Sequence, residues 1–411
     1  MRVLAALLIA STLHAADWIA LRGAGVELVS DAPEKTARLA LDRLEQIRRI
    51  LPPSSEPEPI PLRVFLFAKQ SEYRAYAPDA TAAGFYRSGM ERDYIAMHAG
   101  AVPRVVLHEY AHFAMHQRNV NRPTWLEEGL AEFYSDFNGK QVGLPIPEHL
   151  KLLEQRTWLT AERLNEPREL DELFYAQSWA LVHMLRREPQ FPDKVTPQML
   201  TDLRRYLRTM RPTAVNVAAS TAQPASLEPV SALNALLLRA DLALRSQHPE
   251  LARTLYTQAA REYPNSSSAA TGLATLAFAD GKHDEALAQL KRALELNDRD
   301  ALAWFQWALM ENDEAALEKA AQLNPDLAEA HVLLGVRLTD DGDLDGALAH
   351  LEQATRLMPR KSYAWYSLGY AQNKRGDIMG ARGSLERALR TATSREQRQM
   401  AETLLDSLAQ K

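Results

Sequence analysis

The sequence after residue 231 repeats with a period of 34 residues, and this period constrains the fold more than any other feature. A unit of this length holds two helices and cannot bury its apolar face alone, so neighbouring units must stack. Small residues recur where such helices would touch. The sequence therefore predicts an all-α superhelix. The matched pairs are Ala252 and Ala286, Ala259 and Ala293, Gly335 and Gly369, Gly342 and Gly376, and Ala347 and Ala381.

This period resembles that of the tetratricopeptide repeat, whose stacked units form extended binding surfaces. The resemblance implies that residues 231–411 bind a protein or peptide partner. Three repeats suffice to bury a continuous core, and five are present. We place them at 233–266, 267–300, 301–327 (shortened), 328–361 and 362–393, with a capping helix at 395–409.

One segment of the repeats allows a second interpretation. Asp341, Asp343, Asp345 and Glu352 have the spacing of a calcium-binding loop. The same residues are in register for a repeat whose second helix begins near Asp343, and acidic residues are favourable at a helix N-terminus. A calcium loop would require that helix to unwind, so we expect the repeat.

A different motif occupies residues 108–112, which read His-Glu-Tyr-Ala-His. On a helix, His108 and His112 lie one turn apart on the same face, so both imidazoles can reach one metal ion. Glu109 is turned toward the same place, where its carboxylate can act as a general base for water. The flanking residues are apolar and include no Gly or Pro, which is typical of a buried helix.

A catalytic zinc site uses three protein ligands, so one more is needed. Pro123 is suited to open a second helix, and Glu128 is the best candidate on it, with Glu127 as an alternative. Glu132, one turn further, can accept a hydrogen bond from the other ring nitrogen of a ligating histidine. The alternative, without a metal site, is a pair of amphipathic helices with ordinary buried histidines.

The His-Glu-x-x-His motif, followed at 125–133 by Trp-Leu-x-Glu-Gly-x-Ala-Glu-Phe, is similar to the gluzincin metallopeptidases. More narrowly, it resembles bacterial peptidase-MA-like domains fused to tetratricopeptide repeats. The resemblance implies an α+β, thermolysin-like zinc peptidase domain over residues 16–210. It makes His108, His112 and Glu128 the Zn²⁺ ligands and Glu109 the general base. The implied substrate is a peptide or protein, and we expect endopeptidase rather than aminopeptidase action.

Residues 175–182 are similar to a helix of aminopeptidase-like gluzincins whose tyrosine stabilises the oxyanion. The match implies this role for Tyr175, and one oxyanion donor typically contributes about 10²–10³ in turnover. This chain has Gln177 and Ser178 where that group has Lys-Gly. The alternatives are a core tyrosine at this position and, for the whole domain, an inactive repeat scaffold that retains a peptidase-like domain.

The rest of the N-terminal sequence predicts strands at 18–21, 26–30, 62–67, 84–90 and 94–98 and a helix from Pro33 to Leu51. In a gluzincin, the last of these strands lies along the cleft and pairs with the substrate backbone. Residues 89–92, Gly-Met-Glu-Arg, form an incomplete version of an aminopeptidase signature and suit a hairpin turn equally well.

Composition bears on partners and compartment. The net charge is −5 and there is no long basic run, which argues against nucleic acid as a partner. Cysteine is absent, which excludes thiolate zinc ligands. The apolar run from Val3 to Leu13 after Arg2 predicts a signal peptide at 1–15 and a periplasmic or secreted protein. We expect no membrane span.

Residues 211–230 are small and polar, which is typical of a linker. From this linker we expect a repeat array, residues 231–411, that folds independently and does not dock tightly on the N-terminal domain.

Overall fold

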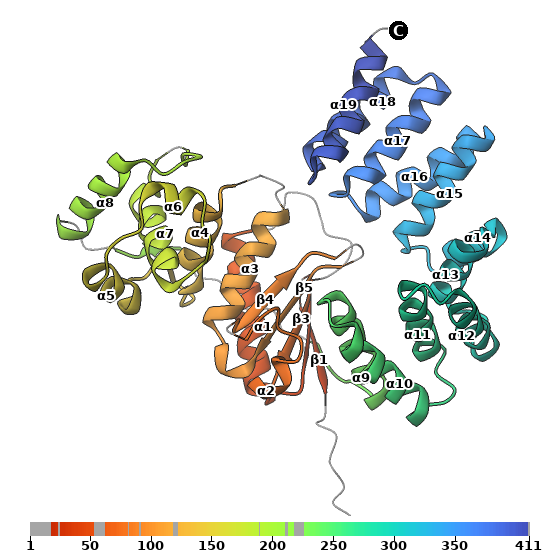
Figure 1. The fold of residues 1–411 in the computed structure, drawn as a ribbon, viewed down its shortest axis with the longest axis horizontal. Coiled ribbons are helices and arrows are strands. Elements are labelled where there is room, and N and C mark those ends of the chain that lie inside the picture. The colour runs from red at the N-terminus through yellow and green to blue at the C-terminus, as the bar shows by residue number, and fades with distance from the viewer. Residues whose placement is uncertain are drawn as a thin grey trace, which may run out of the picture.

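The computed structural model describes residues 18–23, 25–52, 62–80, 82–89, 92–117, 122–188, 190–209, 213–217 and 226–409. The expected signal peptide lies outside the described residues, as do Met90, Glu91 and part of the expected linker. Figure 1 shows a central sheet flanked by a helical unit (α4–α8) and by a long curved array (α9–α19). None of the described helices has the length and apolar character needed to cross a membrane.

A six-stranded mixed sheet forms the centre of the N-terminal part, in the order β4-β5-β3-β2-β1-β8. Pairing is parallel for β2 with β3 and for β3 with β5, and antiparallel elsewhere. All five expected strands are present. The strands are β1 Ile19–Gly23, β2 Val26–Ser30, β3 Leu62–Phe67, β4 Gly84–Arg87, β5 Tyr94–His98 and β8 Ser226–Pro229, while β6 Gln141–Val142 pairs with β7 Val215–Asn216.

The central strands β3 and β5 are buried on both faces, and their side chains alternate between two cores. In β3, Val64 and Leu66 join a core with α1 and α3, whereas Phe65 and Phe67 point into the core on the opposite face. The helical unit continues the first of these cores. The helices are α1 Glu34–Ile50, α2 Gln70–Tyr73, α3 Arg104–Gln117, α4 Thr124–Ser135, α5 Pro147–Gln155, α6 Ala161–Asn165, α7 Glu172–Leu185 and α8 Pro197–Thr209.

The last expected strand, 94–98, was predicted to lie along the cleft with an edge free to pair with substrate, and it does not. β5 does not lie at the edge, because it pairs with β3 on one side and with β4 on the other. Residues 94–97 are fully buried, as befits an interior strand, whereas only Phe85 is buried in β4. β4 is therefore the edge strand next to α3.

Residues 232–409 form five antiparallel helix pairs and a final helix, in the register that the repeat predicts. The glycines recur because paired helices approach closely at them: a Cβ on Gly335 would lie 2.4 Å from Leu351 Cγ, and one on Gly369 would lie 2.8 Å from Leu385 Cγ. The helices are α9 Ala232–Arg245, α10 Pro249–Glu262, α11 Ser267–Ala279, α12 His283–Leu296, α13 Ala301–Glu311, α14 Glu314–Leu323, α15 Ala328–Asp341, α16 Leu344–Leu357, α17 Ser362–Arg375, α18 Ile378–Thr391 and α19 Arg395–Ala409.

The segment with calcium-loop spacing has the repeat conformation. Gly342 ends α15 in the left-handed region, and Asp343 caps α16 by accepting a hydrogen bond from the Gly346 amide at 3.1 Å. Asp345 and Glu352 are helical, and the Asp345 side chain is 94% exposed. The expected repeat arrangement is therefore confirmed for this segment.

The expectation of an undocked array is wrong. Ser226–Pro229, within the expected linker, forms β8 and pairs with β1. The first repeat then covers the second face of the sheet, where Leu236 and Ala240 share a core with Phe65 and Phe67. Without this cover, an aromatic face of the sheet would be exposed to water. Such exposure has a free-energy cost of about 25 cal/mol per Å² of apolar surface.

Candidate metal centre

Two adjacent helices carry the candidate ligands. His108 and His112 lie on α3, whose opposite side is anchored in the core by residues such as Tyr110 and Phe113. Glu128 lies on α4, which is anchored by the fully buried Trp125. The spacing of four residues brings both imidazoles to the side of α3 that faces α4.

The three side chains converge. His108 Nε2 and His112 Nε2 are 3.2 Å apart, and Glu128 Oε2 lies 3.5 Å from the first and 3.4 Å from the second. Among the residues that the structure describes, these three form the one group of three or more with metal-ligand geometry. Glu127, the alternative, does not belong to it.

The residues present fit a zinc ion. Ligand atoms about 2.0–2.1 Å from a tetrahedral zinc are about 3.3 Å from one another, close to the three distances seen here. Glu128 Oε2 is buried and accepts no hydrogen bond. A buried carboxylate oxygen left in this state is costly, and a cation would satisfy it. Two imidazoles and one carboxylate are also a common catalytic zinc set.

Electrostatics favour a positive charge at the same point. Burial by itself lowers the pKa of His108, but the carboxylates of Glu128 and Glu132 raise it to about 10. Burial by itself raises the pKa of Glu128, but the two facing imidazoles hold it at about 2. The surroundings thus stabilise the kind of charge that a divalent cation carries.

Glu132 holds the first histidine in place. Its Oε1 lies 3.1 Å from His108 Nδ1, so that Nε2 is directed at the other ligands. The other oxygen, Oε2, accepts from Arg104 Nη2 at 2.6 Å and lies 3.0 Å from His149 Nε2. These contacts lower the pKa of Glu132 well below its usual range, against the opposing effect of its burial.

Glu109 lies between the ligands and the edge strand β4. A Cβ on Gly84 would be 2.4 Å from Val105 Cγ1 and 3.4 Å from Glu109 Cγ, so β4 runs very close to α3. Burial raises the pKa of Glu109, His108 and His112 act in the opposite direction, and the charge of Glu128 adds to the rise. A carboxylate with a raised pKa is suited to accept and return a proton.

Tyr175 is near the ligands. It lies in the first turn of α7, where Asp171 caps the helix by accepting from the Phe174 amide at 2.8 Å. Its ring centroid is 6.2 Å from that of His108. Burial, followed by the charges of Glu128, Glu132 and Glu109, raises the pKa of Tyr175, which keeps the phenol protonated.

The contacts of α7 with its neighbours explain two residues of the motifs. Gly129 is needed because a Cβ there would lie 2.4 Å from the Ser178 carbonyl oxygen. Gln177, which replaces a lysine of the aminopeptidase pattern, is buried, and its side chain bonds the amide and the carbonyl of Leu159 at 2.6 and 3.2 Å. Gln177 therefore has a structural role here.

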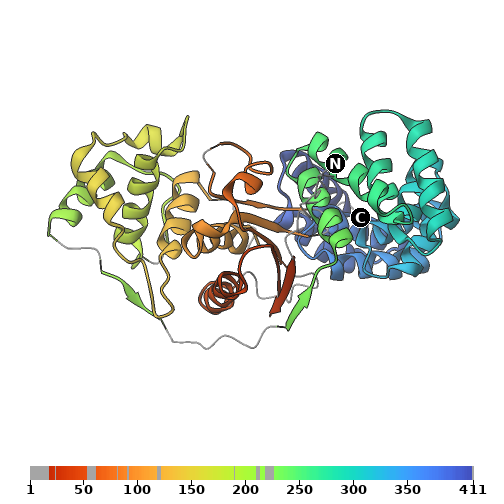
Figure 2. The ribbon, with the colours of Figure 1, turned by 90° about the horizontal axis from the view of Figure 1, so that it is seen from below.

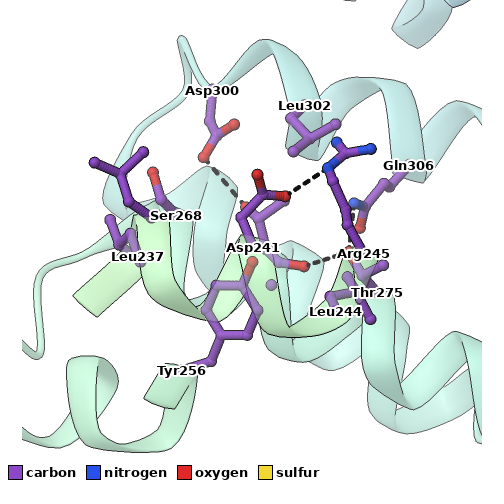
Figure 3. Close-up of a pocket in the computed structure, with 13 residues that line it drawn as sticks. Leu237, Asp241, Leu244, Arg245, Tyr256, Ser268, Thr275, Asp300, Leu302 and Gln306 are labelled. Carbon is purple, nitrogen blue, oxygen red and sulfur yellow. Dashed lines mark hydrogen bonds and ion pairs between the residues drawn. The ribbon is translucent and has the colours of Figure 1, made fainter. Parts of the chain in front are cut away.

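A second candidate site is a cavity of about 520 Å³ between α9, α10, α11 and α13 (Figure 3). Most of its walls are apolar, from side chains such as Leu237, Leu244 and Leu302. Its polar groups bond one another: Asp241 with Arg245 at 3.0 Å, and Asp300 with Thr271 at 3.2 Å. The cavity therefore offers chiefly apolar surface, which suits an apolar side chain of a partner.

Comparisons with known proteins identify the array. A tetratricopeptide-repeat family model matches residues 237–301 and 332–396. Similar solved structures include the tetratricopeptide-repeat protein YrrB, described as having an unusual peptide-binding site (19% identity, 41% of this chain, 90% of that chain, TM-score 0.32). MamA is 22% identical, over 39% of this chain and 91% of that chain, with a TM-score of 0.30. PilF of Pseudomonas aeruginosa is 16% identical, over 43% of this chain and 87% of that chain, with a TM-score of 0.37. The search of curated proteins gave no match.

Residues 232–409 are thus a tetratricopeptide-repeat array, the kind of module that binds a protein or peptide. The sequence interpretation missed two residues of the candidate metal centre, Arg104 and His149. Arg104 had a signal, because it precedes His108 by four residues on the same helix. His149 had none, since only the fold of α5 brings it to Glu132.

Proposed function

We propose that residues 16–210 form a zinc-dependent peptidase of the gluzincin type and that the repeat array recruits its protein or peptide substrate. The observation that carries this proposal is the triangle of His108, His112 and Glu128, with edges of 3.2–3.5 Å. Glu109 beside the triangle and the gluzincin-like sequence at 125–133 support it. The signal-like residues 1–15 support a periplasmic or secreted site of action.

His108, His112 and Glu128 would hold the metal, and Glu132 would orient His108. Bound zinc would supply Lewis acidity, polarising the scissile carbonyl and lowering the pKa of a water molecule. The Glu109 carboxylate accepts a proton from the attacking water and returns it to the nitrogen of the leaving amine. Tyr175 donates a hydrogen bond to the carbonyl oxygen as negative charge develops there.

The edge strand β4 is suited to hold the substrate. Because β4 pairs only with β5 in the described sheet, its other edge can bond an extended peptide as an added strand. Glu109 lies against this strand, since a Cβ on Gly84 would be 3.4 Å from Glu109 Cγ, so a peptide bound there lies next to the general base. This arrangement requires no free N-terminus, which favours an endopeptidase.

The test is zinc content and casein hydrolysis by the full chain, with and without a chelator. We expect about one zinc per chain and activity that the chelator removes and zinc restores. Glu109→Gln should keep the zinc and lose about 10²–10⁴ in rate. Glu128→Gln should lose zinc, while the neighbouring Glu127→Gln, the matched control, should retain it.

Two results would contradict the proposal. A wild-type chain that binds zinc but hydrolyses nothing would indicate an inactive scaffold that retains a peptidase-like domain. Near wild-type hydrolysis by Glu109→Gln would exclude the general-base mechanism.

A further inference from the structure

The repeat array touches the N-terminal domain at a second place, far along the sequence from the first. The turn between α16 and α17 meets Gly89 and Asp93, which lie between β4 and β5 in the sequence. Lys361 Nζ donates to the Gly89 carbonyl at 2.8 Å, and Arg360 Nη2 donates to Asp93 Oδ2 at 3.3 Å. In Figure 2 the array curls so that its first and last repeats both lie on the side of the sheet.

Asp93 connects three elements. Its Oδ1 accepts from the Gly89 amide at 3.1 Å, just beyond β4. Its Oδ2 accepts from Gln117 Nε2 at 2.6 Å and from Arg360. Gln117 is the last residue of α3, the helix that carries His108, Glu109 and His112. The Asp93 side chain is only 4% exposed, so its charge depends on these partners.

We propose that Arg360 and Lys361 are positioning residues for the peptidase site, through which the array holds the edge strand β4 and the end of α3. This inference rests on the proposed peptidase function. β4 is four residues long and pairs on one side only, so its alignment depends on its ends. One end lies against Val105 and Glu109, and the other is held by Lys361 and Asp93.

Releasing this contact should affect turnover and strand order, and leave the metal in place. His108, His112 and Glu128 are held by the α3–α4 core, which does not include the array contact. Glu109, by contrast, lies against Gly84 of β4, where a Cβ would be 3.4 Å from Glu109 Cγ, and would shift with the strand. A substrate that adds to β4 would also meet a less ordered edge. The contact therefore links the array directly to β4 and the end of α3.

The experiment compares the full-length wild type with the double variant Arg360→Ala/Lys361→Ala. The matched control is Lys374→Ala/Arg375→Ala, an adjacent pair of cations at the other end of α17. Its described partners, Tyr370, Asp345 and Asp377, all lie within the array. The readouts are amide hydrogen exchange of peptides covering 84–89 and 112–117, zinc content, and casein hydrolysis.

We expect about tenfold faster exchange in both peptides of the double variant, unchanged zinc content and a lower kcat, with no change in the control. A factor of ten corresponds to 1.4 kcal/mol, close to the lower end for a hydrogen bond to a charged group. Arg360→Lys with Lys361 intact should restore most of the wild-type behaviour. Unchanged exchange at 84–89 and 112–117 would overturn the proposal.

Failure of the underlying function would look different. If exchange increased as expected but the wild type hydrolysed nothing, the contact would stand as a structural link and its role in turnover would be overturned. If exchange increased and kcat stayed the same in an active enzyme, positioning by the array would be refuted while the peptidase proposal stood.

Discussion

Gly129, which follows the candidate ligand Glu128, allows a direct test of how closely α4 must approach α7. Gly129 lies in the middle of α4, where glycine is normally a disadvantage, and Gly383 occupies a similar position in α18. Replacing either by alanine should help the helix by about 1 kcal/mol. The surroundings of the two glycines differ: a Cβ on Gly383 would meet nothing within 4 Å.

A Cβ on Gly129 would lie 2.4 Å from the Ser178 carbonyl oxygen, 2.8 Å from its carbonyl carbon and 2.8 Å from Val182 Cγ2. Two of these atoms belong to the backbone of α7, so no rotamer change relieves the overlap. The helices must separate, and overpacking of this kind typically costs about 1–3 kcal/mol. Set against a gain in helix propensity of about 1 kcal/mol, the overlap should leave Gly129→Ala less stable than the wild type by up to about 2 kcal/mol.

The displaced helix also carries Glu128, so zinc affinity should fall together with stability. The assay is urea unfolding and zinc titration of the full chain for both variants. Gly383→Ala should be stabilised by a few tenths to about 1 kcal/mol and should bind zinc as the wild type does. A Gly129→Ala variant as stable as the wild type, with unchanged zinc affinity, would refute the close approach of α4 to α7.

Three further predictions concern other parts of the molecule. Tyr175→Phe should lower kcat on casein by about 10²–10³ with little change in KM, because the proposed hydrogen bond forms as the oxyanion develops; an effect on KM alone would contradict the role. Phe65 is fully buried between the sheet and the first repeat, so Phe65→Ala should lower the free energy of unfolding by about 3–5 kcal/mol. Phe278 is 46% exposed, so Phe278→Ala should change this free energy little. In the array, burial lowers the pKa of His331 and of its neighbour His350. The neutral rings are thus favoured in the fold, and urea unfolding should show stability lost as the pH falls below about 6.5, less so in His350→Gln.

Sequence spacing predicted what depends on local geometry. The 34-residue period gave the correct helix register, because Gly335 and Gly369 are each required by a neighbouring leucine one helix away. The four-residue spacing of His108 and His112 likewise fixed their common face. Glu128 came from a motif whose glycine, as the structure indicates, reflects the approach of α4 to α7.

The docking of the array depends on contacts between residues more than 100 positions apart, which spacing does not reveal. A signal was nevertheless present in β3. Its sequence, Leu-Arg-Val-Phe-Leu-Phe, is apolar on both faces, which is typical of a strand covered on both sides. One cover is α1 with α3, so the aromatic side chains of the other face required a second layer. The polar composition of residues 211–230 predicted a linker and did not indicate that the array supplies this second layer.

The chain path explains why the candidate metal centre is sensitive to contacts on both of its sides. His108 and His112 lie on α3, which packs on the sheet, whereas Glu128 lies on α4, where the helical unit begins. The chain leaves the sheet after β5 and returns to it at β8, so the helical unit is inserted in the sequence between these two strands. The bonds of Glu132 to His108 and Arg104 cross the same boundary. Any movement of the helical unit against the sheet therefore changes the distance from the imidazoles to Glu128, and the packing of α4 on α3 and α7 sets the ligand geometry.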